Sequence, residues 1–218
     1  MARIVFDLDG TLIDSAPDIR SIANLILSED GLEPISLAET ISFIGNGASV
    51  FVEKMRAARG IPDDNHARLL QAFQDRYDSH FDLTAPYPNV REALAHLRGD
   101  GHRLGLCTNK PMHATRAVLS HLTLNDPWNV IYGGDSLAQR KPDPAPLLAA
   151  LAELGDGPCL YVGDSEVDAE TAERAGVPFL LFTEGYRKTP VDQLTHRATF
   201  ADFADLPALV QSQLAVLA

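Results

Sequence analysis

Five short apolar segments, separated by amphipathic stretches of helical length, constrain the fold of this chain more than any other feature of its sequence. They are rich in β-branched and aromatic residues and are too short for core helices, so each is predicted to be a buried strand. Strands that alternate with helices are typical of parallel sheets with crossover helices. We therefore predict an α/β fold with a doubly wound parallel sheet, a Rossmann-like core. The predicted strands are 3–7, 102–108, 128–134, 158–164 and 177–182.

The long interval between the first two predicted strands has helical periodicity and no strand signal. Ile19, Ile22 and Ile26 fall on one helical face, and the segment that begins Ser36-Leu37-Ala38-Glu39 has the pattern of a capping box. We therefore expect a helical cap, inserted directly after the first strand. The expected division is a core of residues 1–14 and 83–218 and a cap of residues 15–82.

The charge of the chain limits its partners. The formal net charge is −12, so a general attraction to nucleic acid or to acidic membranes is not expected. No window approaches the roughly 20 apolar residues of a membrane span, and the N-terminus lacks the pattern of a signal peptide. We expect a cytoplasmic protein, monomeric or homodimeric, without a nucleic-acid or membrane partner. An anionic substrate would then need a locally positive site.

Polar residues follow three of the predicted strands, at the edge where open α/β sheets bind ligands. The first strand ends in Asp7, with Asp9 two residues later, the second ends in Thr108-Asn109, and the fourth ends in Asp164. Carboxylates that crowd together repel one another unless a cation lies among them. An all-oxygen site of this kind suits Mg²⁺, which also binds substrate phosphates.

Each of these signals is weak when it stands alone. The DxDG pattern is common in turns, and Thr-Asn after a strand is often a helix cap. Lys141 lies between prolines in a segment that could present its charge to an anion, whereas the similar pair Lys110-Pro111 is interpreted as having no function. Cys107 and Cys159 are expected to be buried free thiols. The order of the signals along the chain is harder to explain by turns.

Taken together, the motifs resemble those of the haloacid dehalogenase superfamily over the whole chain. They are DLDGT at 7–11, TN at 108–109, KPDP at 141–144 and GDSxxD at 163–168. The resemblance implies that Asp7 is the nucleophile and forms an aspartyl-phosphate, that Asp9 is the general acid and base, and that Lys141 neutralises charge. It also implies that the first strand lies between the second and the fourth, which separates the two cysteines too far for a disulfide.

The same resemblance implies the binding residues. The implied Mg²⁺ ligands are Asp7, the backbone carbonyl of Asp9, and Asp164. Thr108 and Asn109 are the implied phosphate-binding pair. Two further residues, Thr11 and Asp168, are expected to support the ligands from behind.

Finer detail is similar to the superfamily's phosphatases for 2-phosphoglycolate, chiefly FIGNGA at 43–48. A small phosphorylated metabolite of this kind is the expected substrate. Asn46 and Gly47 are candidate substrate contacts, although a helix-breaking loop explains them equally well. The donor for the substrate carboxylate stays open between backbone N–H groups near Gly47, Arg56 and Arg187. Alternative functions are a sugar phosphomutase similar to β-phosphoglucomutase and a phosphatase of broader specificity. A dehalogenase and a non-catalytic binding module are disfavoured, because Asp9, Asp164 and Lys141 are present.

Overall fold

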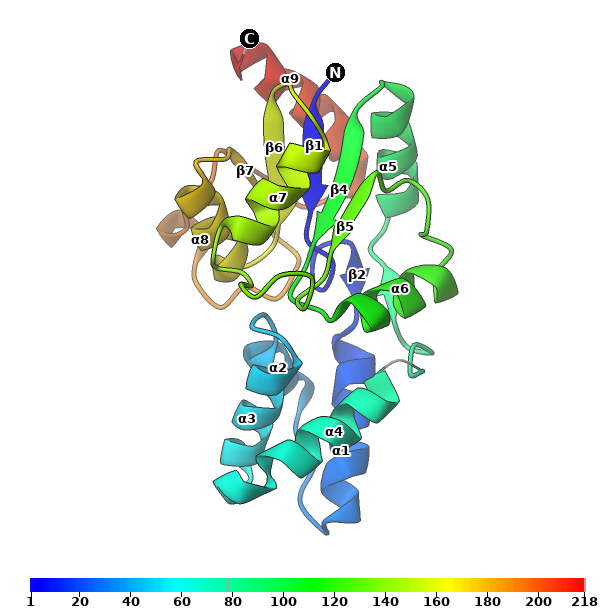
Figure 1. Cartoon of the computed structure of the whole chain (residues 1–218), viewed down its shortest axis with the longest axis vertical. Helices are drawn as coiled ribbons and strands as arrows, with labels where there is room; N and C mark the ends of the chain where they lie inside the picture. Colours follow the sequence, from blue (N-terminus) through cyan, green and yellow to red (C-terminus); the bar gives the residue numbers. More distant parts are fainter. Residues whose placement is uncertain (78, 218) are drawn as a thin grey trace.

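The computed structural model describes residues 1–77 and 79–217, which form an α/β core and a helical cap. Figure 1 shows the cap beneath the core, where it faces the carboxyl edge of the central sheet. In the described part of the chain, no helix combines the length and the apolar composition needed to cross a membrane.

The core sheet confirms the predicted fold class. It has six parallel strands in the order β5-β4-β1-β6-β7-β8, with β1 between β4 and β6 as the resemblance implies. Each of the five predicted segments contains an observed strand. The sixth, β8, was not predicted because Ala198 and Phe200 are separated by Thr199 and preceded by polar residues, so they form no continuous apolar run. The strands are β1 Arg3–Phe6, β4 Arg103–Cys107, β5 Val130–Tyr132, β6 Cys159–Gly163, β7 Phe179–Phe182 and β8 Ala198–Phe200.

Helices cover both faces of the sheet, because successive side chains of each strand point to opposite sides. On one face, Ile4 and Phe6 pack in a cluster with α5 Val90–Gly99, α6 Met112–His121 and α9 Leu206–Leu217. On the other face, Val5 packs with α7 Ala145–Glu153 and α8 Glu166–Ala175. Two short 3-10 helices, Val191–Gln193 and Phe203–Asp205, flank β8.

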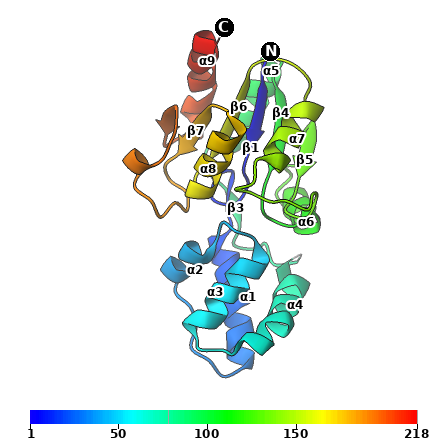
Figure 2. The same ribbon diagram turned by 60° about the vertical axis from the view of Figure 1, so that its left-hand side comes forward.

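The cap has a hydrophobic core of its own. Its helices are α1 Ala16–Glu29, α2 Leu37–Phe43, α3 Ala48–Ala58 and α4 His66–Tyr77, with a 3-10 turn at Asp63–Asn65 (Figure 2). Ile22, Phe51 and Phe73 are buried in this cluster, which Ala114 of the core helix α6 joins. The predicted capping box is present, since Ser36 and Glu39 exchange side-chain and backbone hydrogen bonds at the start of α2.

A short antiparallel ribbon joins the cap to the core. Its strands, β2 Ile13–Asp14 and β3 Ala85–Pro86, bring the two connecting segments side by side. We propose that the division between core and cap falls at this ribbon, at 14/15 and 82/83. The hydroxyl of Tyr186 fixes the entry to α1: it accepts hydrogen bonds from the backbone N–H groups of Ser15 at 2.7 Å and Ala16 at 2.9 Å. The same hydroxyl donates to Asp14 Oδ1 at 2.6 Å.

The two cysteines are free thiols. Cys107 is buried as predicted, but Cys159 is only partly buried, because it begins β6 at the amino edge of the sheet. Both strands pair with β1, so one strand separates the two residues.

We predict that Tyr186→Phe lowers the free energy of unfolding by about 1–3 kcal/mol, because it leaves buried polar groups without their partner. Urea unfolding monitored by circular dichroism measures the change. The matched control is Tyr132→Phe, whose lost hydroxyl bonds the carboxylate of Glu153 at an exposed position. The control should lose less than the Tyr186 variant. Equal losses would mean that the bonds of Tyr186 at the cap entry add nothing particular to stability.

Candidate active site

A small cavity lies where the carboxyl ends of β1 and β4 meet the cap. Its volume is about 40 Å³, enough for roughly three water molecules. The core contributes mainly polar groups and the cap mainly apolar ones. The lining residues are Asp7, Asp9, Thr108, Asn109 and Lys110 from the core, and Ile19, Ile44, Gly45, Gly47, Ala48, Phe51, Phe73 and Tyr77 from the cap. We refer to this cavity as the chamber.

Asp7 directly follows β1 and is buried at the floor of the chamber. Lys141 Nζ lies 2.8 Å from Asp7 Oδ1. Apart from this ion pair, Oδ1 has no hydrogen-bond partner among the described residues. Burial raises the pKa of Asp7 to about 7, against the lowering effect of Lys141, and Asp168 adds to the rise. The carboxylate of Asp7 therefore has few partners and can accept a cation or attack a substrate.

Lys141 is held in place by Asp168. Its ammonium lies 2.7 Å from Asp168 Oδ1 and 2.9 Å from the Tyr161 hydroxyl. Burial by itself would lower the pKa of Lys141, but Asp168 and Asp7 hold it above its ordinary value. The second oxygen of Asp168 accepts hydrogen bonds from the backbone N–H of Asp164 and from the hydroxyl of Ser165. Asp168 has thus committed both oxygens to neighbouring groups.

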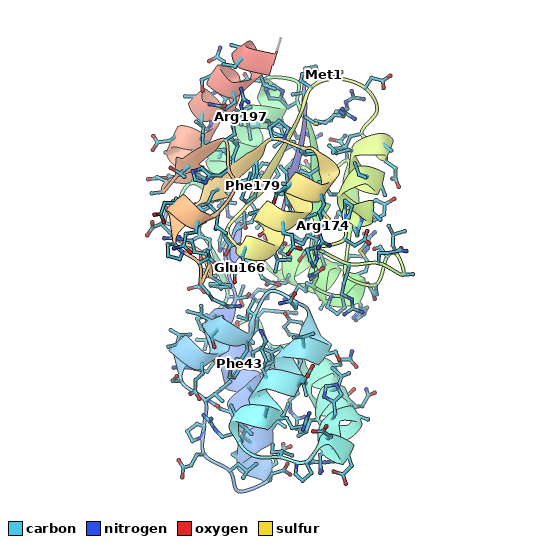
Figure 3. The ribbon with its side chains drawn as sticks, turned by 90° about the vertical axis from the view of Figure 1, so that its left-hand side faces the viewer. Met1, Phe43, Glu166, Arg174, Phe179 and Arg197 are labelled. Atoms are coloured by element: carbon cyan, nitrogen blue, oxygen red, sulfur yellow. The ribbon has the colours of Figure 1, made fainter. Side chains whose placement is uncertain are left out.

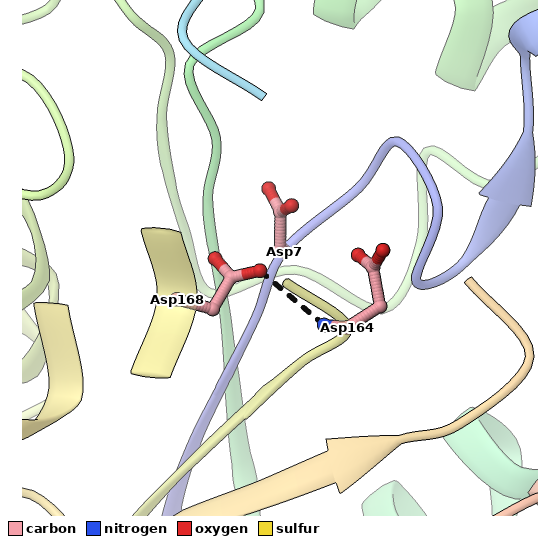
Figure 4. A group of neighbouring side chains, drawn as sticks. All are labelled: Asp7, Asp164 and Asp168. Carbon is pink, nitrogen blue, oxygen red and sulfur yellow. Dashed lines mark hydrogen bonds between the residues drawn. The ribbon is translucent and has the colours of Figure 1, made fainter. Parts of the chain in front are cut away.

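Asp7, Asp164 and Asp168 form a compact acidic cluster (Figure 4), with one oxygen from each within 4.8 Å of the others. Asp164 Oδ1 accepts from the hydroxyl of Thr11 at 2.7 Å, and Oδ2 accepts from the backbone N–H of Tyr186 at 2.6 Å. Burial raises the pKa of Asp164 well above its ordinary value, and the neighbouring carboxylates add to the rise. Each oxygen of Asp164 accepts one hydrogen bond, whereas each oxygen of Asp168 accepts at least two, so Asp7 and Asp164 are the carboxylates with capacity left for a hard divalent cation.

The turn after β1 requires a glycine. Gly10 has a φ of +85°, and a Cβ at this position would lie 2.6 Å from Asp164 Oδ2 and 2.7 Å from the Tyr186 ring. The missing side chain lets the turn that carries Asp7 and Asp9 approach Asp164.

The side chain of Asp9 faces the chamber and not the acidic cluster. Its Oδ1 accepts from the Ser15 hydroxyl at 2.6 Å, and Lys110 Nζ lies 3.2 Å and 3.4 Å from its two oxygens. Asp9, two residues after Asp7, is therefore held at the boundary between core and cap.

Thr108 and Asn109 both line the chamber at the end of β4. The side-chain amide of Asn109 donates to the backbone carbonyls of Gly45 and Lys141, each at 2.9 Å. These bonds tie the cap loop and the loop of Lys141 to the end of the strand. The amide group of Asn109 thus orients its neighbours.

The structure divides the residues that were predicted in the cap. Gly47 lines the chamber and precedes α3 with a φ of +86°, whereas half-buried Asn46 is not among the lining residues. Arg56 is paired with the Ile61 carbonyl and with Asp63 inside the cap. Arg187 donates to the Thr183 carbonyl in a separate surface hollow. Neither arginine reaches the chamber wall.

Lys110, which was not among the predicted site residues, lies in the chamber wall. The side chain is 2% exposed and lines the chamber, where it bonds Asp9 and, at 2.7 Å, the hydroxyl of the cap residue Tyr77. A usable signal was present, because Lys110 directly follows the Thr108-Asn109 pair at a strand end.

A second lysine of the core, Lys188, contacts the cap at the loop before α3. Lys188 Nζ donates to the Ile44 carbonyl at 3.0 Å and lies 3.8 Å from Glu166, which Figure 3 labels at the edge of the core nearest the cap. Burial lowers the pKa of Lys188, and the nearby charge of Lys54 adds to this effect.

A doubly wound sheet with buried carboxylates at its carboxyl edge and a helical cap defines a class of hydrolases. The sequence model of the haloacid dehalogenase-like hydrolase family matches residues 4–182 of this chain. The chain belongs to the haloacid dehalogenase-like hydrolase family.

Individual relatives carry names that are more specific than that of the family. The chain is 51% identical over 220 residues to a phosphoglycolate phosphatase of Cereibacter sphaeroides, with 99% of this chain and 100% of the relative covered. A phosphoglycolate phosphatase of Rhodobacter capsulatus is 42% identical, with 95% and 96% covered. The crystal structure of a predicted phosphoglycolate phosphatase from Haemophilus somnus 129pt superposes with a TM-score of 0.89 at 32% identity, with 95% and 97% covered.

We predict that Asp7 makes the metal-free protein less stable as the pH rises from about 4 to about 7. The pKa of Asp7 is about 7 in the folded protein against an ordinary 3.8, so in this range the folded state binds a proton that the unfolded chain has released. The free energy of unfolding then falls with rising pH, by about 1.4 kcal/mol for each unit of pKa difference at most.

Urea unfolding of wild type and Asp7→Asn in chelator, across this pH range, measures the effect. The asparagine does not titrate, so its stability should fall less steeply with pH than that of wild type. Parallel curves would contradict the raised pKa of Asp7.

Proposed function

We propose that this protein is a Mg²⁺-dependent phosphatase that hydrolyses 2-phosphoglycolate to glycolate and phosphate. The observation that carries the proposal is the 51% identity, over nearly the whole of both chains, to a protein named phosphoglycolate phosphatase. The arrangement of Asp7, Asp9 and Lys141 around the chamber supports the chemistry.

The proposed nucleophile is Asp7. A carboxylate oxygen of Asp7 attacks phosphorus, the bond to the ester oxygen breaks, and an aspartyl-phosphate forms. The contact with Lys141 at 2.8 Å favours the ionised carboxylate that the attack needs and opposes the effect of burial. The hydroxyl of Thr108, buried in the chamber wall, is the proposed donor to a phosphate oxygen.

The proposed acid and base is Asp9. In the first step it gives a proton to the departing alkoxide of glycolate, and in the second it takes a proton from the water that attacks the aspartyl-phosphate. Ser15 and Lys110 hold its carboxylate at the chamber wall, where a leaving group bound to phosphate on Asp7 would lie.

Asp7 and Asp164 are the proposed side-chain ligands of Mg²⁺, with the backbone carbonyl of Asp9 as a third oxygen. When bound, the ion would neutralise charge on the phosphate and on the crowded carboxylates. Thr11 orients Asp164, and Asp168 supports the site by holding Lys141.

The chemistry of the cap side of the chamber favours a small substrate. Its wall is mainly apolar, with Ile44, Phe51 and Phe73, and offers few hydrogen-bond partners for the hydroxyls of a hexose. This argues against the sugar phosphomutase alternative and against a phosphatase that accepts large sugar phosphates.

Comparison of kcat/KM for 2-phosphoglycolate, glycerol phosphate, glucose 1-phosphate and ethyl phosphate tests the substrate. We expect 2-phosphoglycolate to be preferred over ethyl phosphate by one to two orders of magnitude, because a charged hydrogen bond to its carboxylate is worth about 1.5–3 kcal/mol. Excess chelator should abolish the activity and Mg²⁺ should restore it. A preference for glucose 1-phosphate would overturn the substrate, and its isomerisation without phosphate release would establish a mutase.

We predict that Asp7→Asn abolishes the phosphoenzyme and nearly all turnover, since an amide is a poor nucleophile. Asp9→Asn should slow turnover by about 10²–10⁴-fold through loss of proton transfer. Rapid quench with mass spectrometry detects the phosphoenzyme, and phosphate release gives the rate. Asp126→Asn, at a carboxylate that is 86% exposed, is the control and should retain full activity. A phosphorylated position 7 in the Asp7 variant would refute its role.

A further inference from the structure

We propose that Lys110 is the specificity-determining residue that binds the carboxylate of the substrate. This inference deepens the proposed function and rests on it. Lys110 is the only cationic side chain among the described residues that line the chamber. The other lysine of the site, Lys141, lies behind Asp7 and is not part of the chamber lining.

The environment of Lys110 fixes its ammonium inside the chamber. Nζ contacts both oxygens of Asp9 and donates to the Tyr77 hydroxyl, and it lies 3.9 Å from the centre of the Tyr77 ring. The ammonium is therefore buried and is held by a carboxylate of the core and a hydroxyl of the cap.

The ammonium can give one of its donors to a ligand. It carries three N–H groups, and its acceptors are the Tyr77 hydroxyl at 2.7 Å and the two oxygens of Asp9 at the longer distances of 3.2 Å and 3.4 Å. A carboxylate that enters the chamber can take the place of the longer of the two contacts with Asp9. A charge-assisted bond of this kind in a buried site is stronger than a neutral one.

The position of Lys110 matches the geometry of the proposed substrate. The ester oxygen of 2-phosphoglycolate must reach Asp9 to be protonated. Only a methylene and the carboxyl carbon separate that oxygen from the carboxylate oxygens, so the carboxylate must lie close to Asp9. Lys110 Nζ lies 3.2 Å from Asp9 Oδ1, which places a cation on the leaving-group side of the chamber.

Gly47 lines the chamber but carries no charge, and the two cationic alternatives for this role lie elsewhere. Arg56 is paired within the cap, and Arg187 lies in a separate hollow. The rest of the cap wall is mainly apolar, with Ile44, Phe51 and Phe73 facing the chamber. An apolar wall with a single cation accepts a small carboxylate and offers few partners for the hydroxyls of a sugar.

Lys110→Met tests the inference, with 2-phosphoglycolate and ethyl phosphate as the two substrates. The methionine side chain is similar in length to that of lysine but carries no charge. We expect kcat/KM for 2-phosphoglycolate to fall at least tenfold more than kcat/KM for ethyl phosphate. Lys110→Arg keeps the charge and should retain more of the preference. Lys110→Gln replaces the methionine variant if that variant does not fold.

Lys188→Met is the matched control. It removes a cation that contacts the cap at Ile44 but does not line the chamber, so the ratio of the two kcat/KM values should stay at the wild-type level. A Lys110→Met variant that loses both substrates equally would show that Lys110 serves only to hold Asp9, and one that keeps the wild-type ratio would show that it does not read the carboxylate. Both results overturn the inference. A wild type without preference for 2-phosphoglycolate would instead refute the proposed function, before any variant is compared.

Discussion

The ionic contacts of Lys141 are the interaction on which the rest of the site depends. Its ammonium lies within 2.8 Å of a carboxylate oxygen on each side, Asp7 from β1 and Asp168 from α8. Buried carboxylates this close would repel one another strongly in the absence of a cation, and removing one member of such a set is costly because a buried charge is left unpaired. Lys141 therefore allows three carboxylates, two from strand ends and one from α8, to occupy one edge of the sheet.

Much of this arrangement follows from the sequence, because parallel strands bring their carboxyl ends to one edge. Asp7, Thr108 and Asp164 could be placed together once the strands were recognised, and the periodic pattern was sufficient for that. What the sequence could not supply was the direction of side chains across the boundary between core and cap. Lys110 bonds a cap tyrosine more than thirty residues earlier in the chain, and Asn109 bonds a cap carbonyl at Gly45. No local pattern encodes such contacts.

Hydrogen bonds from three core side chains hold the cap over the chamber. Asn109 and Lys188 each hold a backbone carbonyl of the loop before α3, and Lys110 holds Tyr77 at the end of α4. Such contacts at the rim fix the cap while its apolar helices remain packed on one another. The specificity of the site is thus carried by a core cation that is positioned by a cap side chain.

The place of β1 in the sheet has a consequence for synthesis on the ribosome. This strand is made first, yet its partners β4 and β6 are made much later, since Arg3 pairs with Arg103 on one side and with Cys159 on the other. The cap cluster, apart from Ala114, is complete by Tyr77 and needs none of the later strands. Loop closure over such separations is slow compared with local helix packing. The cap helices of the nascent chain can therefore pack together before β4 and β6 have been synthesised. During that time β1, which leads to Asp7, has no partner strand.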